Sequence, residues 1–245
     1  MPQNFSNLTF VIGTVKTVEQ MQTVPTMIPF SDKAILFLST LSAKLLKTGK
    51  TYSDVVTFAF WCRKAALMTE KAQYINNELR LGRGIAFHST PSNVPVNCAF
   101  SFAAGLLAGN PNIVRLPAKD FPQVSLICEA VKETLEEQPE MKPYVVFVRY
   151  AHAQEISDYF SSICATRIVW GGDQTIEHMR QSPLPPRAKE ITFADRHSIL
   201  VLNTEAVLAE ENTSRMAQDF YNDTFFSDQN ACTSPRIIIW LGNDK

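Results

Sequence analysis

Short apolar segments alternate with amphipathic helical patterns from Gly84 onward, and this alternation constrains the fold more than any other feature. It is typical of βαβ crossovers, in which each helix connects two parallel strands. The sequence therefore predicts an α/β fold with a mostly parallel sheet and helices on both faces. The predicted strands are Ile85–His88, Ile113–Leu116, Tyr144–Val148, Ile168–Trp170 and Glu190–Phe193, and the predicted helices between them are Val96–Ala108, Gln123–Glu137, Gln154–Cys164 and Thr175–Gln181.

The flanking segments follow other patterns. Apolar alternation predicts a strand over Leu8–Val15, and apolar spacings of three and four predict a helix that begins at Ser31 and ends at Gly49. A second, longer helical pattern begins at Ser53 and fades near Gly82. Beyond Phe193 we expect a strand at Ser198–Asn203, one polar helical stretch from Thr204 to about Asp223, and a last strand at Ile237–Leu241.

Composition excludes several classes of protein. The 245 residues are 45% apolar and 19% charged, which is typical of a globular chain, and a net charge of -1 disfavours nucleic acid as a partner. Five cysteines without a C-x-x-C pair predict neither disulfides nor a metal site, and favour a reduced, cytoplasmic location. We expect no membrane span, because no run of about 18 apolar residues occurs. The last strand lies almost at Lys245, so we expect the full-length protein to continue.

Three features suggest a functional site from the residues alone. Gly171-Gly172 follows a predicted strand and precedes a helix, so its backbone amides could approach a phosphate; a tight structural turn is the alternative. Asp173 is expected to cap that helix. Cys232 lies in a polar segment and is either a nucleophile or a bystander, whereas the other cysteines fit core positions. His88 ends a strand and could line a site at that edge of the sheet.

Four motifs in order then resemble a known superfamily. They are Thr90-Pro91-Ser92-Asn93-Val94-Pro95, Ala108–Pro117, Trp170-Gly171-Gly172 and Gln229-Asn230-Ala231-Cys232. Together they resemble the landmarks of the aldehyde dehydrogenases, and Trp-Gly-Gly with Cys232–Arg236 is most similar to the acyl-CoA reductases of the LuxC type. The resemblance implies a Rossmann-type nucleotide-binding domain, preceded by a helical scaffold, over residues 1–197. It implies the incomplete start of a catalytic domain over residues 198–245.

The resemblance also implies roles for individual residues. Cys232 matches the nucleophile that attacks an acyl thioester, and Asn93 matches the side chain that holds the oxyanion with the backbone N–H of the nucleophile. For Asn93, a turn residue between two prolines is the alternative. Gly171 and Gly172 match the pyrophosphate turn. The remaining cofactor contacts are expected at Thr90, Pro91, Arg115, Pro117 and Lys119.

The basic residue Lys119 stands where NAD-using relatives carry an acidic one, so with Arg115 it favours NADPH/NADP; a solvated lysine is the alternative. Hydrolytic aldehyde dehydrogenases carry a glutamate base where Thr192–Arg196 aligns, and none stands there. A shift in register would place Glu190 or Asp195 in that role.

The expected function is therefore NADPH-dependent reduction of a fatty acyl-CoA or acyl-protein thioester to an aldehyde through acyl-Cys232. The full-length protein is expected to form a homo-oligomer. The alternatives are a hydrolytic, NAD-linked aldehyde dehydrogenase and a non-catalytic nucleotide-binding module in which Cys232 is inert.

Overall fold

The computed structural model describes residues 7–75, 78–151 and 153–242. The chain divides into two compact units, Met1–Phe193 and Ala194–Lys245, which we call the first unit and the second unit. The boundary predicted from the sequence lies between residues 197 and 198, and the functions assigned to the two halves stay predictions.

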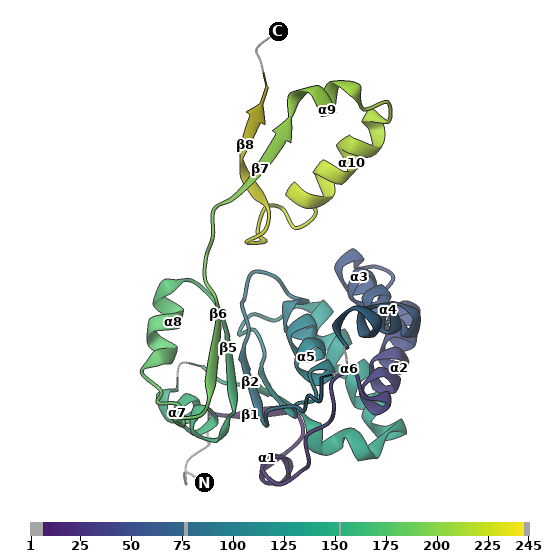
Figure 1. Ribbon diagram of the computed structural model, residues 1–245. Helices are drawn as coiled ribbons and strands as arrows, with labels where there is room; N and C mark the ends of the chain where they lie inside the picture. Colours follow the sequence, from purple (N-terminus) through teal and green to yellow (C-terminus); the bar gives the residue numbers. More distant parts are fainter. Residues whose placement is uncertain (1–6, 76–77, 152, 243–245) are drawn as a thin grey trace. The chain divides into compact units, whose positions relative to one another are not determined.

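Within the described residues, the first unit contains a sheet of six strands in the order β1-β4-β3-β2-β5-β6 (Figure 1). The four pairings among β2 to β6 are parallel, and β1 pairs antiparallel with β4. This confirms the predicted α/β fold. The strands are β1 (Thr9–Ile12), β2 (Ala86–Ser89), β3 (Asn112–Arg115), β4 (Val145–Arg149), β5 (Thr166–Trp170) and β6 (Lys189–Phe193).

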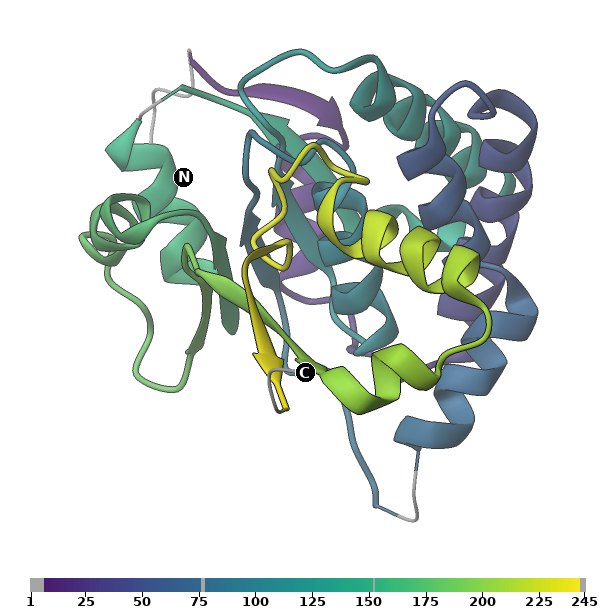
Figure 2. The same ribbon diagram turned by 90° about the horizontal axis from the view of Figure 1, so that it is seen from above.

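Helices cover both faces of this sheet (Figure 2). One face packs against α5 (Asn97–Leu107) and α6 (Pro122–Glu137), which lie beside α2 (Asp32–Thr48), α3 (Ser53–Trp61) and α4 (Lys64–Tyr74). The opposite face packs against α7 (Gln154–Ile163) and α8 (Asp173–Arg180). The short η1 (Pro139–Tyr144) joins α6 to β4. Phe87 on β2 contacts Phe160 of α7 at 5.4 Å between ring centroids, so the central strand is covered on that side as well.

The predicted strands from Gly84 onward are confirmed to within two residues at each end, and so is the helix from Ser31 to Gly49. The Ser31 hydroxyl caps α2 by accepting a hydrogen bond from the N–H of Ala34 at 3.3 Å. At the N-terminus, however, β1 ends at Ile12 and a helix, α1 (Val15–Met21), follows it. Thr14 and Thr17 form a capping box that starts α1, which the alternating pattern did not reveal.

Two predicted single helices are in fact pairs. The pattern from Ser53 breaks between α3 and α4, where buried Cys62 ends the first helix. In the second unit, the stretch from Thr204 forms α9 (Thr204–Ala209) and α10 (Thr213–Thr224), because Asn212 caps a new helix by accepting from the N–H of Arg215 at 3.0 Å.

The second unit is built on two parallel strands, β7 (Ser198–Asn203) and β8 (Pro235–Leu241), joined through α9 and α10. Both strands were predicted from the sequence. Leu200 pairs with Ile238, and the pairing shifts register between Ser198 and Ile199. The loop between α10 and β8 carries Cys232.

Candidate active site

The order of the parallel strands fixes the part of the first unit where a ligand is expected. The chain runs outward from β2 through β3 to β4 and then returns to the other side of β2 to form β5. Ligands of such sheets bind beyond the carboxyl ends of the strands, at the point where the strand order reverses. That point lies between β2 and β5, and the segments that follow these strands are Thr90–Pro95 and Gly171-Gly172.

Thr90 connects the carboxyl ends of two neighbouring strands. Its Oγ1 donates a hydrogen bond to the carbonyl of Arg115 at 2.6 Å. Pro91 is half-buried beyond this contact, and Asn93 is exposed in the loop before α5. The structure therefore brings Thr90 and Arg115 together, and their role in a cofactor site stays a prediction.

Two cations lie at the carboxyl end of β3, Arg115 as its last residue and Lys119 in the loop after it. The Arg115 guanidinium lies over the Tyr150 ring, 4.4 Å from its centroid, and Nη2 donates to the Tyr150 carbonyl at 3.4 Å. Pro117 is buried, whereas Lys119 is exposed with its ammonium group 5.1 Å from the centroid of the Phe121 ring. Arg115 is thus held by aromatic packing, while the long Lys119 side chain keeps its charge in solvent.

The glycine pair lies between β5 and α8. The N–H of Gly171 donates to the Phe193 carbonyl at 3.2 Å, which fixes the turn against β6. Gly172 is the N-cap of α8 and is exposed, and a Cβ placed there would meet nothing within 4 Å. Asp173, which the sequence suggested as the cap, is instead the first residue of the helix. The open helix N-terminus provides backbone donors and positive potential for an anion, which the Asp173 carboxylate partly offsets.

His88 does not line this site, contrary to the expectation from its place at the end of a strand. Its side chain is 1% exposed and forms hydrogen bonds with Ser101 and Asn112 beneath α5. Burial lowers the pKa of His88 to about 4, although the hydrogen bond to Asn112 acts in the opposite direction. His88 is therefore a neutral core residue at physiological pH.

Glu190, one of the two carboxylates that a shift in register would make a base, is paired with arginines. Its Oε2 accepts from Arg167 Nε at 3.0 Å, and its Oε1 accepts from Arg180 Nε at 2.7 Å. Asp195 is exposed, and its carboxylate accepts from the neighbouring N–H of Arg196 at 3.0 Å. The contacts of Glu190 are those of a structural ion pair.

Cys232 is the one cysteine of the five that is not buried. Its carbonyl accepts a hydrogen bond from the Ser198 hydroxyl at 2.7 Å, which anchors the loop to the start of β7. Burial raises the pKa of Cys98, Cys128 and Cys164 to about 12 and that of Cys62 higher still. Those four thiols stay protonated at neutral pH, and the role of Cys232 as the nucleophile stays a prediction.

The loop before Cys232 is made of tight turns. Asp228 and Gln229 have φ angles of 49° and 57°, in the left-handed region that residues other than glycine rarely adopt. The N–H of Asp228 donates to the Phe225 carbonyl at 2.9 Å, and the N–H of Ser234 donates to the Ala231 carbonyl at 3.1 Å. Backbone strain of this kind clusters at functional sites, and Gln229 stands three residues before Cys232.

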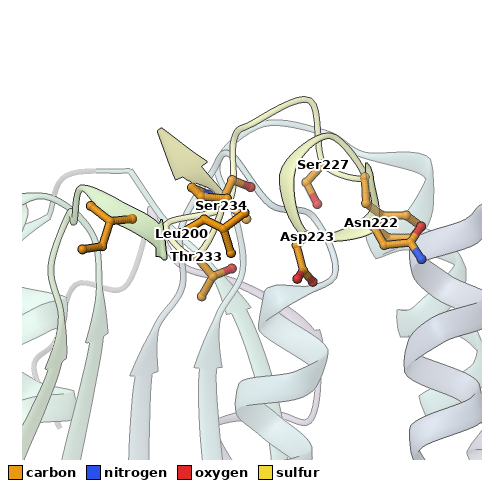
Figure 3. A pocket seen from close by; sticks show the side chains of 10 residues that line it. Leu200, Asn222, Asp223, Ser227, Thr233 and Ser234 are labelled. Carbon is orange, nitrogen blue, oxygen red and sulfur yellow. The ribbon is translucent and has the colours of Figure 1, made fainter. Parts of the chain in front are cut away.

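A pocket of about 440 Å³ lies within the second unit (Figure 3), and Cys232 is not among its lining residues. Both neighbours of Cys232 in the chain, Ala231 and Thr233, line it. Its wall combines apolar and polar side chains, and no sequence pattern indicated it because its members come from three separate segments. The other lining residues are Ile199, Leu200, Asn222, Asp223, Phe226, Ser227, Ser234 and Pro235.

The predicted site residues thus fall into two groups. Thr90, Pro91, Asn93, Arg115, Pro117, Lys119, Gly171 and Gly172 belong to the first unit, and Cys232 belongs to the second. The approach of Asn93 to Cys232 that an oxyanion site requires stays a prediction. Among the described residues, no helix is long and apolar enough to cross a membrane.

Comparison with known proteins places these features in context. Residues 21–245 match the family described as acyl-CoA reductase (LuxC). The long-chain acyl-protein thioester reductase of Vibrio harveyi is 27% identical over 162 residues, which are 66% of this chain and 33% of that protein. The reductase of the same description from Photorhabdus laumondii is 25% identical over 167 residues, 66% of this chain and 32% of that protein. The chain spans about a third of the length of these curated relatives.

Among solved structures, a salicylaldehyde dehydrogenase from Pseudomonas putida G7 matches with a TM-score of 0.65 at 14% identity. The match covers 92% of this chain and 51% of that one. At this identity the likeness shows the fold alone, which is that of the aldehyde dehydrogenases.

Proposed function

The chain belongs to the acyl-CoA reductase (LuxC) family, and from this premise we propose that it reduces a fatty acyl thioester to the aldehyde with NADPH through an acyl-Cys232 intermediate. The acyl donor is coenzyme A or a protein thiol. The observation that carries the proposal is the contrast between Cys232, which is partly exposed between two residues that line a pocket, and the four buried cysteines of the chain.

The first half of the reaction centres on Cys232 of the second unit, with Asn93 of the first unit as the proposed oxyanion residue. The Cys232 thiolate attacks the thioester carbonyl, a carbon–sulfur bond forms to Cys232, and the donor thiol leaves as the original thioester bond breaks. The Ser198 hydroxyl holds the Cys232 carbonyl and so limits the movement of the nucleophile. Asn93 and the backbone N–H of Cys232 would stabilise the oxyanion that forms on the carbonyl oxygen.

The first unit offers groups that fit a phosphorylated dinucleotide. The open N-terminus of α8 at Gly172 would receive the pyrophosphate, while Arg115 and Lys119 would hold the 2′-phosphate of the adenosine ribose. When bound, NADPH supplies the hydride that reduces the acyl group. Thr90 keeps the segment after β2 next to Arg115, and Pro91 and Pro117 limit the flexibility of the loops around it.

Acyl transfer to a single residue tests the covalent step. The protein is incubated with radiolabelled long-chain acyl-CoA, denatured and counted for label that is stable to denaturation. Wild type and the matched control Cys164→Ala should both retain label, whereas Cys232→Ala should retain less than about a tenth of it, because the remaining thiols are protonated and buried. Full labelling of Cys232→Ala would show that another residue is acylated and would overturn the proposed mechanism.

Dissociation constants for NADPH and NADH test the choice of cofactor. Wild type should bind NADPH more tightly than NADH. Lys119→Glu should raise the dissociation constant for NADPH by about tenfold or more, because it replaces a cation with a negative charge that repels the phosphate. The exposed Lys142, in η1, provides the control Lys142→Glu, which should leave both constants unchanged. Tighter binding of NADH by wild type contradicts the cofactor part of the proposal.

The contacts of Glu190 argue against the hydrolytic alternative. A base that activates water must accept a proton, but the Glu190 carboxylate accepts hydrogen bonds from Arg167 and Arg180 that favour its charged form. We therefore propose that Glu190 is not the base of a hydrolytic enzyme and that the acyl-enzyme is reduced.

A further inference from the structure

A chain of hydrogen-bonded side chains lies between α5 and the sheet and ends at the turn that contains Gly171. Trp170 Nε1 donates to Ser101 Oγ at 3.0 Å, and Ser101 Oγ lies 2.8 Å from His88 Nδ1. His88 Nε2 lies 2.9 Å from Asn112 Oδ1, and Asn112 Nδ2 donates to the Asn110 carbonyl at 2.7 Å. All of these side chains except that of Trp170 are buried.

The contacts fix the direction of every hydrogen bond in this chain. Asn112 Oδ1 can only accept, so His88 carries its proton on Nε2 and its Nδ1 is an acceptor. Ser101 must then donate its hydroxyl hydrogen to His88, which leaves its oxygen lone pairs to accept from the Trp170 indole. Each buried group is satisfied in this one arrangement, and reversing any bond would leave a buried donor or acceptor unpaired.

Gly105 makes room for the chain. A Cβ at this position would lie 2.1 Å from Asn112 Oδ1 and 3.0 Å from His88 Nε2. Only glycine therefore lets α5 lie close enough to the sheet for Ser101 to reach both His88 and Trp170.

The face of the Trp170 ring also has a contact. Its ring stacks on Phe193 with centroids 3.7 Å apart and planes inclined by 9°. The N–H of the next residue, Gly171, donates to the carbonyl of the same Phe193 at 3.2 Å. Trp170 is thus bonded at its edge, stacked on its face and joined directly to the glycine turn.

We propose that Trp170 is a positioning residue whose indole, held by Ser101 and Phe193, fixes the Gly171-Gly172 turn in the conformation that binds the cofactor pyrophosphate. The inference rests on the proposed function, because that function assigns the pyrophosphate to this turn. It adds three residues that hold the indole in place and do not contact the cofactor themselves: Ser101, His88 and Asn112.

Binding of NADPH to the full chain tests the inference, with the dissociation constant measured by calorimetry. Ser101→Ala removes the acceptor of the indole N–H, and Trp170→Phe removes the N–H but keeps a ring to stack on Phe193. Each should raise the dissociation constant about 3- to 10-fold, the effect of one lost hydrogen bond. The matched controls Ser162→Ala, on the exposed side of α7, and Trp240→Phe, on exposed β8, should change it less than twofold.

Acylation of Cys232 by acyl-CoA in the absence of dinucleotide separates positioning from general damage. A specific effect on the turn leaves the acylation rate of Ser101→Ala and Trp170→Phe at the wild-type value, whereas loss of structure slows it together with cofactor binding. If one variant fails to fold, the other still removes the same hydrogen bond.

Two outcomes would overturn the inference, and they are distinguishable. If wild type binds NADPH and both variants bind it equally well, the positioning role is wrong while the proposed function stands. If wild type binds neither NADPH nor NADH, the proposed cofactor site fails and the inference fails with it.

Discussion

The ion pairs of Glu190 make a sharp prediction for the substitution Glu190→Gln. Arg167 is 3% exposed, and its guanidinium donates to Glu190 Oε2 from Nε at 3.0 Å and from Nη2 at 2.5 Å. Its Nη1 donates to Ser161 Oγ at 3.1 Å and to the Ser182 carbonyl at 2.7 Å. The Glu190 carboxylate is the only anion that pairs with Arg167 among the described residues, so its neutralisation leaves a buried positive charge.

The magnitude follows from burial. Breaking a buried pair by removing one partner costs about 3–5 kcal/mol, and glutamine still offers one acceptor, so we expect a loss at the lower end, about 3 kcal/mol. For a unit of this size about 1 kcal/mol shifts the melting temperature by about 2–4 °C, which predicts a fall of about 6–12 °C. The exposed Glu177 on α8 provides the control, and Glu177→Gln should change the melting temperature by less than about 2 °C.

The pH dependence has a definite sign. Burial acts to raise the pKa of Glu190, but hydrogen bonds and charge from Arg180 and Arg167 outweigh it, so the pKa lies below its ordinary value. A lowered pKa stabilises the folded state above the unfolded pKa of about 4.3, and this contribution is lost as the pH falls through the folded value. The difference in stability between wild type and Glu190→Gln should therefore be full at pH 7 and shrink in acid.

Thermal unfolding by circular dichroism at several pH values, together with the rate of hydrolysis of the acyl-enzyme, distinguishes a structural role of Glu190 from a role as catalytic base. Unchanged stability with slower hydrolysis would refute the structural role and identify Glu190 as the base of a hydrolytic enzyme.

Three further predictions follow from single contacts. Gly105→Ala should destabilise the first unit by about 1–3 kcal/mol in thermal unfolding, because its methyl group would overlap Asn112 Oδ1; Gly172→Ala, where space is open, is the control. Ser198→Ala should slow acylation of Cys232 about 3- to 10-fold in rapid-quench assays with labelled acyl-CoA, and Ser198→Thr should retain the rate. Iodoacetamide at pH 7 should alkylate Cys232 before any other cysteine, and equal labelling of Cys128 would contradict the burial argument.

Local signals in the sequence predicted elements whose ends depend on local chemistry. Ser31 and Gly49 bound α2 because a hydroxyl cap and a glycine stop act within a few residues. The break between α3 and α4 carries no glycine or proline at Cys62-Arg63, so the apolar pattern continued across it. That break is set by the packing of buried Cys62 in the core, which is a tertiary effect.

Part of the candidate site was likewise predictable from local sequence, and part depends on tertiary contacts. The edge of the sheet followed from the alternation of strands and helices, because parallel strands bring their carboxyl ends to one side. The pocket of the second unit and the contacts of Trp170 could not be predicted, since they join Leu200 to Asn222 and Ser101 to Trp170, residues far apart in the chain.

The position of His88 shows how strand geometry decides between a site residue and a core residue. Successive side chains of a strand point to opposite faces of the sheet, and Phe87 contacts α7 on one face. His88 must therefore face α5, beneath a helix and away from solvent at the end of the strand. Because an imidazole buried there requires a partner on each nitrogen, its presence on this buried strand predicts polar residues near it on α5 and β3, and Ser101 and Asn112 are those residues.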